Sequence, residues 1–327
     1  MVRIWSEGSL SSRSSDRKCE MKDVLIINPK ASKGVRRFAE KKILEALSAA
    51  GITTELFRTE YAGHAAELAE AAAKSGADRV FIAGGDGSIN EAVNGLVNAR
   101  KQGVDKTALG FIPAGRGNDF CDALGIPKDL KKIAEILKED RRLCCDIGAA
   151  GDGTFERYFI NGSGFGIESA INYYATKSVI SGKLSYLYGI VKSIFNDLLV
   201  QDAEIEIDGK AMRYPFVMFA AMNGRQEGGG FRLAPNYRLD DGLLDICMVG
   251  GNIPAARLLL TIPHLSNGTL DFPGILSMQA ASVHVHLDPD KKGLFSQVDG
   301  ETIIEHGYDF YSRISPWKLE IIINGNQ

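Results

Sequence analysis

The first 140 residues alternate short strand-like runs with longer segments in which apolar residues recur every three or four positions. Buried strands are predicted at 23–27, 53–58, 79–83 and 109–113. Helical spacing follows at 35–50, at 64–74, from the glycine turn to residue 99, and at 130–137, and Gly51 ends the first of these helices. Strands that alternate with helices in this way form parallel βα units. The pattern therefore predicts an N-terminal α/β domain with a parallel sheet.

The pattern changes after about residue 145, where alternating and short apolar runs dominate. Residues 203–207 alternate apolar and acidic side chains and turn at Asp208-Gly209. Further strands are predicted at 214–222, 243–249 and 283–287, and a helix at 183–199. This half predicts an all-β domain, a mostly antiparallel β-sandwich with a few inserted helices. The run 319–323 is placed to cross back to the first domain.

These changes of pattern divide the chain into four expected parts. Residues 1–21 are predicted to be a disordered tail that is rich in Ser and Arg. They lack the apolar segment of a secretory signal peptide. The α/β domain is expected at 22–145 and the β-sandwich at 146–312. The C-terminal segment is expected at 313–327.

Three polar loops that contain glycine follow the first, third and fourth predicted strands, at 28–34, 84–90 and 114–119. The carboxyl ends of parallel strands share one edge of a sheet, where ligands collect. Glycines in the middle loop allow close backbone approach to a phosphate, and the helix that follows offers free N–H groups. Asp86 would repel a phosphate unless a divalent cation lay between them. An ordinary strand-to-helix turn is the alternative, and the two companion loops favour the phosphate site.

Two acidic turns lie in the second half. The segment 240–242 is either a plain hairpin turn or a Mg²⁺ site built from one carboxylate, backbone carbonyls and water. The segment 299–301 is either a turn or, if extended, a pair of acids on one face that suits general-base catalysis. His284 and His286 alternate on a predicted strand and are interpreted as surface residues rather than ligands.

Composition, charge and missing motifs argue against several classes of function. The 38 basic and 41 acidic residues give a net charge of −3, which offers no global attraction to nucleic acid. No apolar run approaches the ~20 residues of a membrane span. The five cysteines show no disulfide or zinc spacing, so a reducing cytoplasm is expected. A Walker P-loop, a dinucleotide fingerprint, a hydrolase triad and a zinc-protease motif are all missing.

Taken together and in order, these segments resemble the catalytic-domain family of diacylglycerol kinases, bacterial lipid kinases related to sphingosine kinases. The resemblance spans residues 22 to about 323 and is carried by Asn28-Pro29 with Gly34, Gly84–Glu91 with Asn94-Gly95-Leu96, Pro113–Phe120, Leu233–Asp245, and Asp299-Gly300-Glu301. Gly-Gly-Asp-Gly alone is shared with NAD kinases and phosphofructokinases. The ordered set is similar to the lipid-kinase branch.

The resemblance implies a two-domain fold with ATP and Mg²⁺ in the cleft. Contacts with ATP are implied for Asn28, Thr59, Gly84, Gly85, Asp86, Gly87, Ser88, Ile89, Asn90, Gly115, Arg116, Asn118 and Asp119. Asp86 and Asp119 would also join an aspartate–water–Mg²⁺ network near the phosphates. Many family members carry Thr where this chain has Arg116; an arginine can still pair with phosphate, but the usual hydroxyl contact is lost.

In the second domain, the resemblance implies a structural Mg²⁺ on the Asp241 carboxylate and the backbone carbonyls of Arg238 and Leu243. It implies Glu301 as the proton acceptor, with Asp299 as the competing candidate.

The implied activity is ATP- and Mg²⁺-dependent phosphorylation of a lipid hydroxyl, with diacylglycerol as the family default. Such an enzyme is expected to be cytoplasmic, with transient peripheral contact at the inner face of the membrane, and a homodimer is left open. Two alternatives stay open at this stage. One is a kinase of NAD or another small molecule from the same superfamily, and the other is an inactive homologue that binds nucleotide or lipid.

Overall fold

The protein is described by a computed structural model over residues 21–31, 39–115, 117–178, 188–189, 192–193, 196, 200–228, 230–250 and 255–325. Residues 1–20 of the predicted tail at 1–21 lie outside these residues. So do Val35 and Phe38 of the first predicted helix, Arg116, and most of the predicted helix at 183–199.

The N-terminal half is an α/β domain, as predicted. Its strands run parallel in the order β4-β3-β1-β2: β1 (Asp23–Ile27), β2 (Thr54–Arg58), β3 (Arg79–Gly84) and β4 (Ala108–Pro113). Its helices are α1 (Glu40–Ala49), α2 (His64–Lys74), α3 (Asp86–Lys101), α4 (Asp119–Ala123) and α5 (Leu130–Glu139). The short helix α4 begins inside the segment expected to be a loop.

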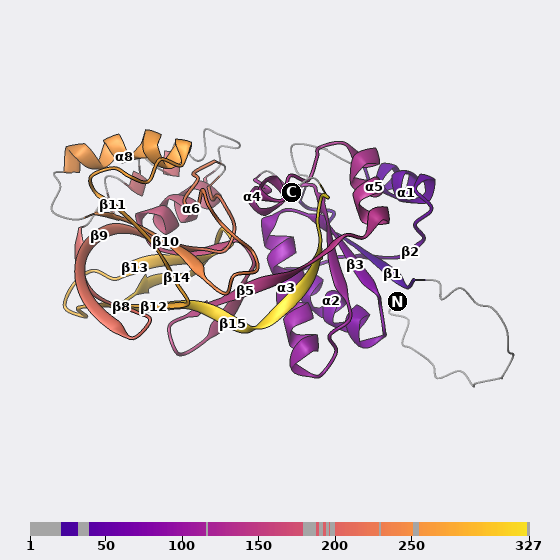
Figure 1. Ribbon diagram of the computed structural model, residues 1–327, viewed down its shortest axis with the longest axis horizontal. Helices are drawn as coiled ribbons and strands as arrows, with labels where there is room; N and C mark the ends of the chain where they lie inside the picture. The colour runs from indigo at the N-terminus through magenta and orange to yellow at the C-terminus, as the bar shows by residue number, and fades with distance from the viewer. Residues whose placement is uncertain are drawn as a thin grey trace, which may run out of the picture.

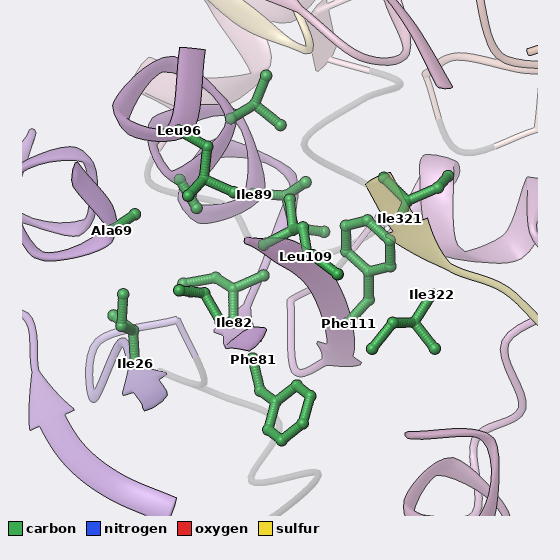
Figure 2. Packing of buried hydrophobic residues seen from close by; sticks show 14 of the residues in the cluster. Ile26, Ala69, Phe81, Ile82, Ile89, Leu96, Leu109, Phe111, Ile321 and Ile322 are labelled. Carbon is green, nitrogen blue, oxygen red and sulfur yellow. The ribbon is translucent and has the colours of Figure 1, made fainter. Parts of the chain in front are cut away.

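The first core is continuous because strands β1, β3 and β4 are buried along their whole length. A strand covered on both faces carries an unbroken apolar run, which is the pattern these segments show in the sequence. Figure 2 shows Phe111 of β4 beside Ile321 and Ile322 from the C-terminal strand, with Ile89 of α3 in the same cluster. The end of the chain thus helps to build the first domain's core.

The C-terminal half is a β-sandwich-like domain, again as predicted. Its strands are β7 (Gly162–Gly166), β8 (Gln201–Ile207), β9 (Lys210–Met222), β10 (Leu244–Gly250), β11 (Ile275–Ala280), β12 (Ser282–Leu287), β13 (Leu294–Val298) and β14 (Glu301–Gly307). Neighbouring strands pair antiparallel, and β9 lies between β8 and β7 and also pairs with β10. The helices here are α6 (Ile167–Lys177) and α8 (Ala255–Asn267).

Two long strands connect the halves, and Figure 1 shows them running between the two bodies. β5 (Arg142–Gly151), which also pairs with β6 (Glu156–Phe159), lies antiparallel to β15 (Asp309–Ile322). β15 pairs with β12 near its start and, in parallel, with β4 at Ile321 and Leu109. One 15-stranded sheet therefore passes through both halves. Helix α3 lies against β6 and near the β13–β14 turn.

Candidate active site

The loops after β1 and β3 meet through side chains. Asn28 Nδ2 donates to Ser88 Oγ over 2.9 Å. Gly84 has no room for a side chain, because a Cβ there would lie 2.5 Å from the Ser88 Cβ. Thr59, directly after β2, is buried, and its N–H donates to the Ile27 carbonyl at 2.9 Å. The ends of β1, β2 and β3 therefore converge at one edge of the sheet.

The third loop packs directly on the second through backbone. A Cβ on Gly115 would lie 2.4 Å from the Gly85 Cα, so only glycine allows this approach. Asn118, at φ 61°, closes the third loop: its Oδ1 accepts from the Gly115 N–H and its Nδ2 donates to the Gly115 carbonyl, both over 3.0 Å. The predicted convergence of the three loops is confirmed.

Asp86 opens helix α3 at the centre of this junction. Its Oδ2 accepts from the Asn118 N–H at 2.7 Å, while its buried Oδ1 has no hydrogen-bond partner among the described residues. Burial raises the pKa of Asp86 to about 7, and the charge of Asp119 adds to the rise. Asp119 is buried and accepts a 3.3 Å hydrogen bond from Gln226 Nε2. Two neighbouring carboxylates with an orphaned oxygen fit a divalent cation that prefers oxygen ligands.

Asp299 lies in the tight turn between β13 and β14, with φ 46° at Asp299 and 82° at Gly300. Of the two alternatives for 299–301, the structure has the turn, and the turn sends Asp299 and Glu301 to different surroundings. The Asp299 carboxylate is buried and accepts four hydrogen bonds, from Asn90 Nδ2 and from the backbone N–H groups of residues 160, 161 and 162. Burial raises the pKa of Asp299, and these donors oppose the rise.

Glu301 begins β14 and reaches toward the first turn of α3. A Cβ on Gly87 would lie 2.3 Å from Glu301 Oε1, so the carboxylate rests against the glycine loop of the other domain. Arg157 of β6 holds it there: Nη2 lies 2.5 Å from Glu301 Oε2, and Nε donates to Asn90 Oδ1 at 2.8 Å. The Glu301 side chain is 41% exposed. It is both oriented and accessible.

The last two residues of the predicted ATP loop have side chains engaged elsewhere. Ile89 is buried in the first core. Asn90 is fully buried, and its Nδ2 donates to the Tyr158 carbonyl and to Asp299 Oδ2, both over 2.8 Å. Asn90 thus ties α3 to β6 and to the β13–β14 turn.

The segment 240–242 lies in the long connection between β9 and β10, so the plain hairpin alternative is wrong. Asp241 Oδ1 accepts from the Leu243 N–H at 3.0 Å, while the Arg238 side chain pairs with Asp240. Asp146, fully buried in β5, accepts from the Gly242 N–H at 2.7 Å and pairs with Lys318 Nζ at 2.7 Å. Asp146 therefore anchors this turn to the strands that connect the domains.

Sequence reasoning missed several of these residues. Gln297 Nε2 donates to both Glu227, which is buried, and Glu168, which is partly buried. Burial raises the pKa of Glu168 to about 7, and burial together with the charge of Glu168 raises the pKa of Glu227 well above its ordinary range. Glu227 directly precedes the triple glycine at 228–230, which was a usable signal. Arg157 has no motif, because only the pairing of β6 with β5 places it beside Glu301.

This arrangement defines a class of enzyme. Three glycine loops lie at the ends of parallel strands, an aspartate pair lies among them, and a glutamate reaches over from the second domain. Those are the parts that a kinase needs to position phosphates and activate an acceptor hydroxyl.

Comparison with known proteins gives the family. Residues 22–150 match the diacylglycerol kinase catalytic domain, and residues 163–323 match the YegS C-terminal NAD kinase beta sandwich-like domain. A diacylglycerol kinase of Bacillus subtilis is 32% identical over 69% of this chain and 72% of its own length. A protein of Enterobacter sp. named "Probable lipid kinase YegS-like" is 32% identical over 64% and 69%. The chain belongs to the diacylglycerol kinase family and is a lipid kinase.

Solved structures agree on the fold. A diacylglycerol kinase of Bacillus anthracis superposes with a TM-score of 0.71 at 23% identity, over 95% of this chain and 99% of that one. An NAD kinase of Archaeoglobus fulgidus in complex with ATP superposes with a TM-score of 0.50 at 13% identity, over 93% and 94%. Within the described part of the chain, no helix is long and apolar enough to span a membrane.

Proposed function

We propose that this lipid kinase transfers the γ-phosphoryl group of ATP to the free hydroxyl of diacylglycerol, with Mg²⁺ as its metal. The observation that carries the proposal is the position of Glu301, whose carboxylate lies against Gly87 at the start of α3. A base from the second domain is thereby brought to the loop that would hold the phosphates in the first. The family membership supports the lipid acceptor.

On the nucleotide side, the free N–H groups at the start of α3 would receive phosphate oxygens, helped by the partial positive charge of the helix N-terminus. The nucleotide would lie along Asn28, Thr59 and the loops 84–90 and 115–119. Asp86 and Asp119 would hold Mg²⁺, which neutralises phosphate charge when bound. The turn with Asp241 and the carbonyls of Arg238 and Leu243 remains our proposal for a structural Mg²⁺, steadied by the hydrogen bond from Gly242 to Asp146.

On the acceptor side, Glu301 would take the proton of the lipid hydroxyl as its oxygen forms a bond to phosphorus and the bond from phosphorus to ADP breaks. Arg157 would hold the carboxylate in place, since its two nitrogens span Glu301 and Asn90. Asp299 is the weaker candidate for this role. Four donors occupy its two oxygens, so it has no lone pair directed to a substrate.

The acceptor resides in a bilayer, so the proposed reaction requires transient contact with a membrane surface. We place that contact at the inner face of the membrane, where ATP is available.

The test is a side-by-side phosphoryl-transfer assay with the purified full chain, Mg²⁺ and γ-labelled ATP. The acceptors are diacylglycerol, monoacylglycerol and a sphingoid base in mixed micelles, and NAD in solution, with products identified by mass spectrometry. We expect phosphatidic acid as the main product. Turnover of NAD alone would overturn the proposal, and so would phosphorylation of a different lipid in preference to diacylglycerol.

The matched variant is Asp86→Ala, which removes the carboxylate from the glycine loop. We expect it to lose nearly all transfer to lipid while remaining folded. If it kept wild-type transfer, the glycine loop would not be the phosphate site. If neither protein phosphorylated any acceptor although both bound ATP, the inactive-homologue alternative would stand instead.

A further inference from the structure

Three side chains of the types that can bind metal ions meet on the sheet of the second domain, where each is partly exposed. His284 and His286 come from β12, and Asp309 comes from the start of β15. His284 Nε2 lies 2.6 Å from Asp309 Oδ1, and His286 Nδ1 lies 2.6 Å from Asp309 Oδ2. The three ligand atoms lie within 4.8 Å of one another. Across the described ranges, this is the one group of three or more such residues that converges in this way.

The strand period and the register produce this cluster. Val283, Val285 and Leu287 are buried in the sandwich core, so the two histidines between them face outward together. Pairing of β12 with β15 sets Asp309 directly opposite His286. The two imidazole rings lie with their centroids 3.9 Å apart. Three donors from two adjacent strands are therefore held on one face by backbone pairing.

The neighbouring strand adds negative charge to the same face. In the register of β8 with β12, Glu206 lies opposite His284 and Glu204 lies opposite His286. Directly opposite residues of antiparallel strands project from the same side of a sheet. A cation bound to the cluster would thus be flanked by two further carboxylates, which favour its approach.

We propose that His284, His286 and Asp309 form a binding site for a divalent first-row transition metal, with Zn²⁺ as the type ion. Two imidazole nitrogens and one carboxylate oxygen are the donors that such ions select, whereas Mg²⁺ prefers oxygen alone. The metal would bind the lone pair of one nitrogen on each neutral imidazole, whose proton moves to the other ring nitrogen or, from a charged ring, to solvent, and water would complete the coordination. This site is separate in position and donor chemistry from the Asp86 and Asp119 pair.

The bound metal would clamp β12 to β15. β15 continues from Asp309 to Ile321, where it pairs with β4 of the first domain. A ligand that binds the folded chain and not the unfolded chain raises its thermal stability. The site therefore predicts a metal-dependent rise in Tm.

The experiment uses the full chain without a histidine tag, stripped of metal and kept in excess Mg²⁺ so that sites built from oxygen ligands are saturated. Zn²⁺ is titrated by calorimetry, Co²⁺ by its visible absorption, and Tm is measured with and without Zn²⁺. We expect one Zn²⁺ per chain, a tetrahedral-type Co²⁺ band and a higher Tm. Zn²⁺ binding without a preferred stoichiometry would overturn the proposal.

Two variants and a control locate the site. His284→Ala and Asp309→Asn each remove a ligand, and each should weaken Zn²⁺ binding by more than the ~10–100-fold that loss of an outer hydrogen-bond partner costs. Both should also lose the Tm rise. His306→Ala changes an exposed histidine on β14 and should bind Zn²⁺ as the parent does. Equal binding by His284→Ala and the parent would overturn the proposal. These experiments measure Zn²⁺ binding and thermal stability. The kinase proposal is tested separately, by the phosphoryl-transfer assay.

Discussion

Asp299 and Glu301 are separated by a single glycine, yet the fold gives them opposite surroundings. Asp299 is 4% exposed and accepts hydrogen bonds from three backbone N–H groups and one side-chain amide. Glu301 has a side chain that is 41% exposed and is held by one arginine at 2.5 Å. The Asp299 carboxylate is occupied by hydrogen bonds within the protein, whereas the Glu301 carboxylate is accessible to a substrate.

The fold thus gives two acids of one turn different roles. A buried carboxylate with all its oxygens satisfied fixes backbone, because removing it would orphan several donors at once. A general base needs a free lone pair that a substrate hydroxyl can reach. The left-handed conformation at Asp299 and Gly300 creates this division, since an extended chain would have put both acids on one face.

Glu301→Gln tests whether Glu301 is the general base, and we expect it to have the largest effect. Glutamine keeps the size of the side chain but cannot accept the proton, so kcat for lipid phosphorylation should fall by about 10²–10⁴-fold. The Tm should stay near that of the wild type, because the side chain is partly exposed. Steady-state kinetics and thermal melting measure the two effects.

The control for that variant is Glu305→Gln on the same strand, where the exposed carboxylate pairs with Lys177 at 3.6 Å. It should keep kcat within about twofold, as expected for an exposed ion pair. Equal losses in the two variants would mean that the general charge of β14, not Glu301, supports the reaction.

Asp299→Asn tests whether the Asp299 carboxylate has a structural role. Asparagine tolerates the left-handed backbone at this position, so the change isolates the hydrogen bonds. Its amide nitrogen would face donors in place of an acceptor oxygen, and each orphaned buried donor costs about 1–3 kcal/mol. We expect the free energy of unfolding to fall by about 3 kcal/mol in urea titrations, with activity lost in parallel. A variant as stable as the wild type but without activity would instead make Asp299 the base.

Arg157→Lys tests the link between the two acids. Arg157 reaches Glu301 with one nitrogen and Asn90 with another, and a single ammonium cannot reproduce that fork. We expect kcat to fall about tenfold, since a misplaced general base transfers protons less efficiently. The KM for ATP should change little. A large rise in that KM with kcat unchanged would show that Arg157 serves the nucleotide and not the base.

Much of the fold could be predicted from the sequence, because β1, β3 and β4 carry unbroken apolar runs and β12 alternates strictly. The three glycine loops were also predictable, since parallel strands deliver them to one edge of the sheet. The left-handed turn at Asp299 could not be separated from an extended segment, as Asp-Gly-Glu is compatible with both. Its outcome depends on donors from residues 160–162, which are distant in the sequence.

Strand pairing explains the other omissions. Arg157 becomes a partner of Glu301 only after β6 pairs with β5, and Asp309 meets His284 and His286 only after β15 pairs with β12. A single sequence shows that β12 has two outward histidines but does not show which strand lies beside it. Contacts between side chains on different strands therefore need the structure, whether the residues are 144 apart in the sequence, as Arg157 and Glu301 are, or 25, as His284 and Asp309 are.

Glu168→Gln gives the smallest expected effect and extends the comparison to a third kind of acid, one that is partly buried beside a second, buried acid. Burial raises the pKa of Glu168 from the ordinary 4.5 to about 7, and its partner Glu227 keeps one buried oxygen without a hydrogen bond. A folded-state pKa above the unfolded value stabilises the fold fully below about pH 4.5, and that contribution is lost as the pH rises through about 7. Glutamine cannot ionise, so the variant should not show this loss.

Urea unfolding across this pH range should therefore give curves that diverge as the pH rises. Above pH 7 the variant should be more stable than the wild type by on the order of 1 kcal/mol, less than the full shift because Glu168 keeps part of its surface in water. Glu305→Gln, an exposed acid, should instead run parallel to the wild type. Parallel curves for Glu168→Gln as well would mean that Gln297 satisfies this acid as fully as the four donors satisfy Asp299. Glu168 would then belong with Asp299 as an acid that the protein satisfies.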